Sequence, residues 1–198
     1  TLYFGGGTPS RLRSESIARV IDAVQAAIPA SRSALEITLE VNPSTTERAR
    51  LAAFRAAGVN RLSIGVQSFA DATLKRLGRA HRAEEGRATV AAARDAGFAN
   101  LSLDLLFAAP AQTRADLEAD LDAFLACAPQ HVSAYALTLE EGTPFEHAAR
   151  RGRLALPEED DVAVMLERIA ECFAAAGLAR YEVSSYARAG FESRHNRR

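Results

Sequence analysis

The feature that most constrains the fold of this chain is a junction that occurs three times. In each copy an apolar helical pattern stops at a glycine, and a β-rich run begins a few residues later. The three glycines are Gly58, Gly97 and Gly177. Glycine suits the left-handed backbone position after a helix because it has no Cβ. The repeat therefore predicts a chain in which helices alternate with strands.

Six short apolar runs are the predicted strands: residues 2–4, 35–41, 62–66, 101–107, 132–139 and 181–183. Three apolar stripes at helical spacing are expected to face the core: Ile17, Val20, Ile21, Val24 and Ile28; Leu117, Leu121 and Leu125; and Val162, Met165, Leu166, Ile169 and Phe173. Parallel strands need a crossover long enough to hold a helix. The order therefore predicts βα units on a parallel sheet.

Two of the helices have clear start signals. Ser44 is followed three positions later by Glu47, and Thr113 stands in the same relation to Asp116. In such a capping box, the hydroxyl and the carboxylate both accept hydrogen bonds from free amides of the first turn. We therefore expect helices to begin directly after Ser44 and Thr113.

Length and composition narrow the fold class to a single α/β domain. The 198 residues, 48% hydrophobic and 25% charged, are typical of one globular domain rather than a disordered or fibrous chain. Six strands are too few for a complete eight-stranded barrel, so we expect an open or partial (β/α)6-type, TIM-like barrel. The chain begins inside a strand and reaches Arg198 without a closing element. The domain, residues 1–198, is therefore expected to be incomplete at both ends.

Net charge and cysteine content give no positive signal for nucleic-acid or metal binding. The formal charge of −1 offers no basic field for nucleic acid, and neither a long apolar span nor a signal peptide is evident, so a cytoplasmic protein is predicted. Cys127 and Cys172 are the only cysteines. Both lie in apolar helical segments, too far apart in sequence for a zinc or iron–sulfur motif. We expect them to pack in the core.

The ends of the first three strands carry candidate ligand-binding residues, because chemistry in βα folds gathers where strands end. Gly5, Gly6 and Gly7 follow the first strand and either admit a ligand to the bare backbone or form a plain turn. Glu40 closes the second strand, where a surface carboxylate is equally common. Gln67 closes the third and either binds a ligand or caps a loop.

Asp104 and Arg79 are further candidates. Asp104 interrupts the apolar run 101–107, and a buried carboxylate needs partners to offset its desolvation. A ligand hydroxyl or amine is the favoured partner, and a structural hydrogen bond is the alternative. Arg79 follows Leu77-Gly78 in a loop, where its guanidinium either forks onto a ligand carboxylate or is merely solvated.

Taken together, five motifs resemble the radical S-adenosylmethionine proteins of the HemN/HemW group, in the same order and over essentially the whole chain. The motifs are Gly5-Gly6-Gly7-Thr8-Pro9, Glu40-x-Asn42-Pro43, residues 60–69, Leu77-Gly78-Arg79 and Leu103-Asp104-Leu105. The resemblance implies S-adenosylmethionine bound across the open end of a partial barrel, beside a [4Fe-4S] cluster held by a Cys-x-x-x-Cys-x-x-Cys loop. That loop and the first barrel strand are absent here and would lie upstream of Thr1. The resemblance therefore implies a truncated chain without its cluster ligands, and the alternative is a natural degenerate copy of such a protein.

The resemblance also implies roles for individual residues. Gly6, Gly7 and Thr8 would contact the methionine portion, Arg79 its carboxylate, and Glu40, Gln67 and Asp104 the amine and ribose. A zwitterion that carries a diol needs hydrogen-bond acceptors for its ammonium and hydroxyl groups and a guanidinium group for its carboxylate. The division among the last three residues stays open.

Two functions compete within the group. HemN-type enzymes are oxygen-independent coproporphyrinogen III dehydrogenases, whereas HemW-type proteins are haem chaperones that transfer haem to acceptor proteins. Residues 181–196 resemble the HemW pattern that leads into His-Asn-x-x-Tyr-Trp, so the chaperone is preferred. His195 would then be an axial haem ligand, with an exposed terminal histidine as the alternative. The resemblance also allows a membrane-associated acceptor and a homodimer, and a barrel protein that modifies RNA is disfavoured by the charge.

Two pairs of residues depart from the pattern of the group, and one pair of histidines matches no motif. Ala108 and Ala111 stand where the group usually has glycine, so a positive φ at either position would cost energy. Arg197 and Arg198 stand where the HemW pattern leads to Tyr-Trp. His131 and His147 match no motif and are interpreted as surface or loop residues. We also predict that these 198 residues alone do not cleave S-adenosylmethionine.

Overall fold

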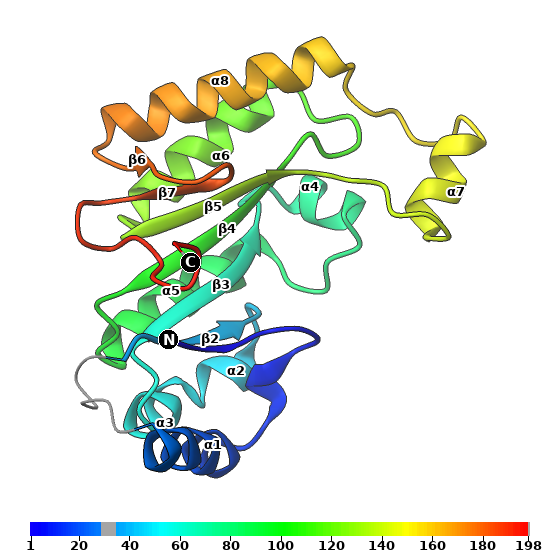
Figure 1. Cartoon of the computed structure of the whole chain (residues 1–198). Helices are drawn as coiled ribbons and strands as arrows, with labels where there is room; N and C mark the ends of the chain where they lie inside the picture. Colours follow the sequence, from blue (N-terminus) through cyan, green and yellow to red (C-terminus); the bar gives the residue numbers. More distant parts are fainter. Residues whose placement is uncertain (29–34, 198) are drawn as a thin grey trace.

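The computed structural model describes residues 1–28 and 35–197 and contains one curved, seven-stranded sheet (Figure 1). The strand order is β1-β2-β3-β4-β5-β7-β6. The first five strands are parallel: β1 Leu2–Phe4, β2 Ile37–Val41, β3 Arg61–Gln67, β4 Leu101–Phe107 and β5 His131–Ala136. Because β1 and β6 form its two edges, the sheet is an open, partial barrel of the predicted α/β class.

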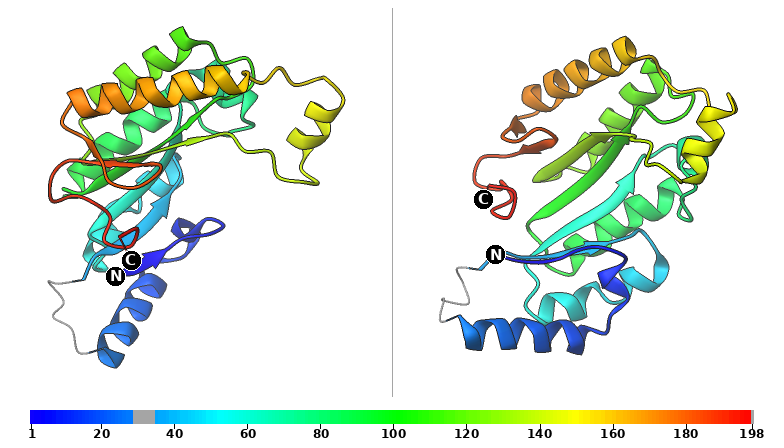
Figure 2. Two further views of the ribbon diagram at one scale, coloured as in Figure 1. Left: turned by 45° about the horizontal axis from the view of Figure 1, so that its top comes forward. Right: turned by 45° about the vertical axis from the view of Figure 1, so that its right-hand side comes forward.

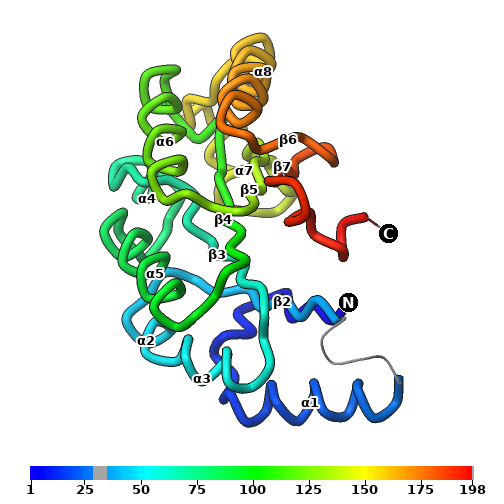
Figure 3. The backbone as a smooth tube through the Cα atoms, turned by 90° about the vertical axis from the view of Figure 1, so that its left-hand side faces the viewer, coloured from blue at the N-terminus to red at the C-terminus, as the bar shows by residue number. Residues whose placement is uncertain are grey.

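Helices surround the convex side of the sheet, and both termini lie at its open side (Figures 2 and 3). Only α7 projects away from the body, on the long connection after β5. The helices are η1 Pro9–Arg11, α1 Ser14–Ala27, α2 Thr45–Arg48, α3 Leu51–Ala56, α4 Asp71–Arg76, α5 Ala83–Asp95, α6 Arg114–Ala126, α7 Pro144–Arg150 and α8 Glu159–Ala175. Among the described residues, no helix combines the length and apolarity that a bilayer crossing requires.

The two faces of the sheet differ in chemistry. Positions such as Leu39, Leu62 and Leu103 point to the helices and are fully buried in the apolar core. The alternate positions form what we call the lumen face, because successive side chains of a strand point to opposite sides. This face carries Tyr3, Thr38, Glu40, Arg61, Ser63, Gly65, Gln67, Ser102, Asp104, His131, Ser133 and Tyr135. A face this polar is suited to a polar ligand rather than to a dry core.

The predicted local signals are confirmed. Gly58, Gly97 and Gly177 have φ values of 110°, 84° and 77°, the left-handed region that glycine tolerates. Ser44 Oγ accepts from the Glu47 amide at 3.1 Å. Thr113 and Asp116 form the complete capping box at the start of α6.

The end of the sheet differs from the prediction. Residues 181–183 are the connection between β6 (Ala179–Arg180) and β7 (Ser185–Ala187), not a strand. Both pairings of β7 are antiparallel, with β5 and with β6. The chain reverses here because the Glu182 carboxylate accepts from the Ser184 amide at 3.2 Å and from Ser185 Oγ at 2.9 Å, which closes a local turn. The last unit is therefore a hairpin rather than a further parallel strand.

One of the apolar stripes is only partly buried. Ile17 and Ile21 of α1 are buried, but Val20 and Ile28 are 44% and 57% exposed. Because α1 lies at the outside of the domain (Figure 3), only one narrow face of the helix contacts the core. Cys127 and Cys172 are free, partly buried thiols that pack against the core, as predicted.

Candidate functional site

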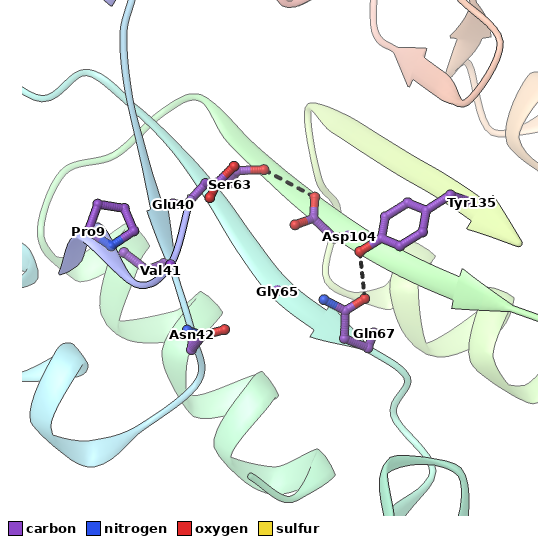
Figure 4. Close-up of a pocket in the computed structure, with 10 residues that line it drawn as sticks. Pro9, Glu40, Val41, Asn42, Ser63, Gly65, Gln67, Asp104 and Tyr135 are labelled. Atoms are coloured by element: carbon purple, nitrogen blue, oxygen red, sulfur yellow. Dashed lines mark hydrogen bonds between the residues drawn. The ribbon is translucent and has the colours of Figure 1, made fainter. Parts of the chain in front are cut away.

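A pocket lies at the carboxyl ends of the parallel strands, where the strand-end argument places the site (Figure 4). It is lined by Gly7, Pro9, Glu40, Val41, Asn42, Ser63, Gly65, Gln67, Asp104 and Tyr135. Four of the predicted ligand-binding residues are therefore brought together here, although they come from four separate segments. Parallel pairing produces this convergence, because it sets the ends of β1 to β4 along one rim.

Glu40 is held in place from two sides. The Tyr3 hydroxyl donates to Glu40 Oε1 at 2.9 Å, and the Gly6 amide donates to Oε2 at 3.2 Å. Gly6 and Gly7 have φ values of 78° and 45°, so the turn needs glycine to bring its amides toward the carboxylate. Thr8, the third predicted contact of this turn, is half-buried at the start of η1. A fixed carboxylate with bare backbone beside it suits a ligand ammonium group.

Asp104 lies at the bottom of the pocket, and part of its side chain faces the open space. It accepts a hydrogen bond from Ser63 Oγ at 3.1 Å and another from Ser133. Burial raises the pKa of Asp104 to about 7, although the Ser63 hydrogen bond and the positive charge of Arg61 act in the opposite direction. Ligand hydroxyls could donate to this carboxylate once it is ionised.

Gln67 ends β3 in an unusual backbone conformation. Its φ of 67° is in the left-handed region, and the register with β4 shifts between Ile64 and Gln67. Tyr135 donates its hydroxyl to Gln67 Oε1 at 2.8 Å (Figure 4). A non-glycine residue in this region costs of the order of 1–3 kcal/mol, and such strain is typical of functional sites. The irregularity aims the amide across the pocket.

Arg79 does not line this pocket. It is exposed in the loop after α4 and borders a separate hollow that Asp71, Lys75, Gly78 and His81 also line. Its charge nevertheless lowers the pKa of Tyr135, in opposition to the dominant effect of burial, which raises that pKa to about 12. Arg79 therefore lies near enough to act on the rim from outside.

His195 lies at the open side of the sheet rather than in the pocket. It is exposed and stacks on Tyr3 with ring centroids 4.7 Å apart. The backbone amides of Arg194 and His195 donate to the Glu36 carboxylate at 3.2 and 3.3 Å, which fixes this segment against β2. The predicted haem ligand and the pocket are thus separate sites with one side chain between them.

The interpretation of His131 as a surface or loop residue is wrong. His131 begins β5 and is fully buried, between Ser102 Oγ and the Tyr181 hydroxyl, each 2.7 Å from a ring nitrogen. Tyr181 also accepts from the Ser193 amide at 3.0 Å. Burial, with Arg61 nearby, lowers the pKa of His131 to about 3, so the ring is neutral. By contrast, His147 is exposed on α7, as expected.

Sequence reasoning missed four contributors to the site: Tyr3, Asn42, Ser63 and Tyr135. A signal for Asn42, Ser63 and Tyr135 was present, because polar residues recur at every second position along these strands. On β3, for example, Arg61, Ser63 and Gln67 are polar, and Gly65 between them carries no apolar side chain. That alternation marks one polar face even in strands flanked by helices.

The residues present fit S-adenosylmethionine but not an iron–sulfur cluster. Two carboxylates, an amide and bare glycine backbone supply the acceptors and the close approach that the nucleoside zwitterion needs. Over residues 1–28 and 35–197, no three His, Cys, Asp or Glu side chains could hold a metal ion. Cys127 directly follows α6 and Cys172 lies on α8, both at the helical layer. The described residues therefore provide no ligand set for a cluster.

Comparison with known proteins assigns the family. A family model described as the Radical SAM superfamily matches residues 1–124. This match covers more than half of the chain, and the chain belongs to the Radical SAM superfamily.

Curated relatives narrow the resemblance further. The chain is 38% identical to "Heme chaperone HemW" of Bacillus subtilis over 99% of its own length and 52% of the relative. It is 42% identical to the bovine "Radical S-adenosyl methionine domain-containing protein 1, mitochondrial", of which it covers 44%. The solved structure of coproporphyrinogen III oxidase (HemN) from Escherichia coli matches 96% of the chain with a TM-score of 0.81 and 28% identity, over 44% of that protein. The chain thus spans about half the length of these relatives.

Proposed function

We propose that this chain is the S-adenosylmethionine-binding part of a haem chaperone. The observation that carries the proposal is the convergence of Glu40, Gln67 and Asp104 with the glycine turn in one pocket. The relatives named HemW support the haem function. The Radical SAM family also implies a [4Fe-4S] cluster, for which the described residues provide no ligand set.

Each residue has a role in the proposal. Glu40 accepts from the ligand ammonium group, Asp104 and Gln67 bind the ribose, and the turn of Gly6, Gly7 and Thr8 contacts the methionine portion. Arg79 reaches the carboxylate from the rim. His195 is the axial haem ligand, because a neutral imidazole binds haem iron directly.

The nucleoside site is tested by isothermal titration calorimetry with S-adenosylhomocysteine. Glu40→Gln and Asp104→Ala are expected to weaken binding by at least about tenfold, since each removes a charged acceptor worth about 1.5–3 kcal/mol. Arg168→Ala, on the exposed surface of α8, is the matched control and keeps wild-type affinity. Equal affinity in all variants would place the ligand elsewhere.

The haem site is tested by titrating ferric haem and following the Soret absorbance. His195→Ala is expected to lose the histidine-ligated spectrum, whereas His147→Ala, an exposed histidine on α7, keeps it. Loss in both variants, or in neither, would contradict the assignment. Transfer of haem to an acceptor protein, a membrane-associated acceptor, a homodimer, the absence of a nucleic-acid partner and a cytoplasmic location stay predictions.

A second candidate is an oxygen-independent coproporphyrinogen III dehydrogenase that uses the same pocket. It is favoured by the extent of the structural match to HemN. Binding of coproporphyrinogen III that survives His195→Ala, without haem uptake by the wild type, would favour this enzyme over the chaperone.

A further inference from the structure

Tyr3 contacts both proposed sites. Its hydroxyl donates to Glu40 Oε1 at 2.9 Å in the nucleoside pocket. Its ring stacks on His195, with an angle of 27° between the ring planes. The two ends of the chain lie close together in Figures 1 and 2, and the stack joins them. One side chain therefore joins the pocket to the candidate haem ligand.

The pocket end of this connection is tightly packed. A Cβ at Gly5 would lie 2.7 Å from Tyr3 Cε1 and 3.1 Å from Glu40 Oε1, so the glycine turn closes directly over the Tyr3–Glu40 pair. Glu40 Oε2 is in turn fixed by the Gly6 amide at 3.2 Å. Any ligand that orders Glu40 and this turn also orders the Tyr3 ring.

The other end holds the imidazole with one nitrogen free. His195 Nδ1 lies 3.5 Å from Thr1 Oγ1, a long contact, and Nε2 has no hydrogen-bond partner among the described residues. The Glu36 carboxylate anchors the backbone of the same segment through two amides. The Tyr3 ring is thus the surface against which a metal-binding imidazole is oriented.

We propose that Tyr3 is a positioning residue that couples the two sites, so that occupancy of the nucleoside pocket strengthens haem binding at His195 and the reverse. The inference rests on the proposed function. The coupling is positive because both ligands favour the same arrangement of the Tyr3 side chain: a ligand on Glu40 holds the acceptor of the Tyr3 hydroxyl, and haem on His195 holds the imidazole that stacks on the Tyr3 ring. By linkage, the two affinities change by the same factor.

The experiment measures that factor with S-adenosylhomocysteine and ferric haem. Calorimetry gives the nucleoside affinity with and without saturating haem, and Soret titration gives the haem affinity with and without the nucleoside. In the wild type we expect a factor of about 5 or more in both directions. In Tyr3→Phe, which keeps the ring and loses the hydroxyl, the factor falls to about one while the Soret spectrum is unchanged.

Two further variants separate coupling from general damage. Tyr3→Leu removes the stacking surface and is expected to alter the Soret spectrum as well. Tyr135→Phe removes the other tyrosine hydroxyl of the pocket, which bonds Gln67 and not Glu40, and is expected to keep the coupling factor. If Tyr3→Phe does not fold, Glu40→Ala replaces it and is compared with Glu40→Gln, which keeps an acceptor for the Tyr3 hydroxyl. Measured without nucleoside, the haem affinity of Glu40→Ala is expected to be about threefold lower than that of Glu40→Gln.

The outcomes are distinct. Both ligands binding to the wild type without coupling, or with a coupling that Tyr3→Phe leaves intact, would overturn this inference while the proposed function stands. No binding of either ligand would remove the proposed function and this inference with it.

Discussion

The two faces of the same sheet follow opposite rules. On the helix-facing side, Leu39, Leu62 and Leu103 are completely buried among apolar neighbours. On the lumen face, one residue earlier on β2 and β3, Thr38 and Arg61 are also buried, yet Thr38 Oγ1 and Arg61 Nε have no hydrogen-bond partner among the described residues. The first face stabilises the fold, whereas the second accepts polar groups at some cost in stability. The comparison implies that substitutions on the two faces have different effects.

The largest expected change in the free energy of unfolding comes from a substitution on the helix-facing side of the sheet. Leu39→Ala should lower the free energy of unfolding by about 2–5 kcal/mol, because it leaves a cavity in the apolar core. Its neighbour on the lumen face, Thr38→Val, should change it by less than about 1 kcal/mol, since the hydroxyl it removes has no partner. Urea unfolding measures both. Equal losses would show that the two faces do not differ as proposed.

A smaller expected effect is the pH dependence of stability that arises from Asp104 in the pocket. The folded-state pKa of Asp104, about 7, lies above the ordinary value, so the folded protein binds more protons between about pH 4 and pH 7 and this residue makes stability fall as pH rises through that range. Asp104→Asn should remove this contribution, leaving the opposite contribution of His131, and raise stability at pH 8 by about 1–3 kcal/mol. Thermal unfolding across pH checks this, and a variant with the wild-type slope would refute it. The same substitution should weaken nucleoside binding at pH 8.

His131 should produce the opposite slope. Its pKa of about 3 lies below the unfolded value, so the unfolded chain takes up a proton that the folded protein does not, and stability falls as pH drops from about 6.5. His131→Gln should remove this contribution, so that stability at pH 5 relative to pH 6.5 rises by about 1–2 kcal/mol compared with the wild type. The exposed His147→Gln serves as the matched control and should retain the slope. A pH dependence identical to that of the wild type would assign it to other groups.

The smallest expected change in stability comes from substitutions in the loop after β4. Ala108 and Ala111 adopt φ values of 56° and 54°, the costly conformation anticipated from their replacement of glycine. Ala108→Gly and Ala111→Gly should each stabilise the fold by about 0.5–1 kcal/mol. Ala109→Gly, between them and without a positive φ, should destabilise it slightly. Stabilisation by all three variants would mean that backbone strain is not the cause.

Much of the site was predictable, because its residues occupy strand ends. Glu40, Gln67 and Asp104 stand next to strongly patterned strands, and parallel pairing brings such ends together whatever the exact curvature. Tyr3 was not found, because its role depends on contacts with Glu40 and with His195, at the far end of the sequence. Arg79 was placed by motif in the site, but the loop after α4 leaves it at the rim.

The sequence by itself predicted three amphipathic helices, two capping boxes and the glycine junctions, because each depends on residues within one or two turns of one another. Parallel pairing followed from the alternation of strands and helices, since parallel strands need a crossover that can hold a helix. Tertiary structure alone decided the burial of His131, the reversal into an antiparallel β7 and the contact of the two chain ends at Tyr3 and His195. These features depend on the curvature of the sheet, which brings together side chains that local periodicity treats as unrelated.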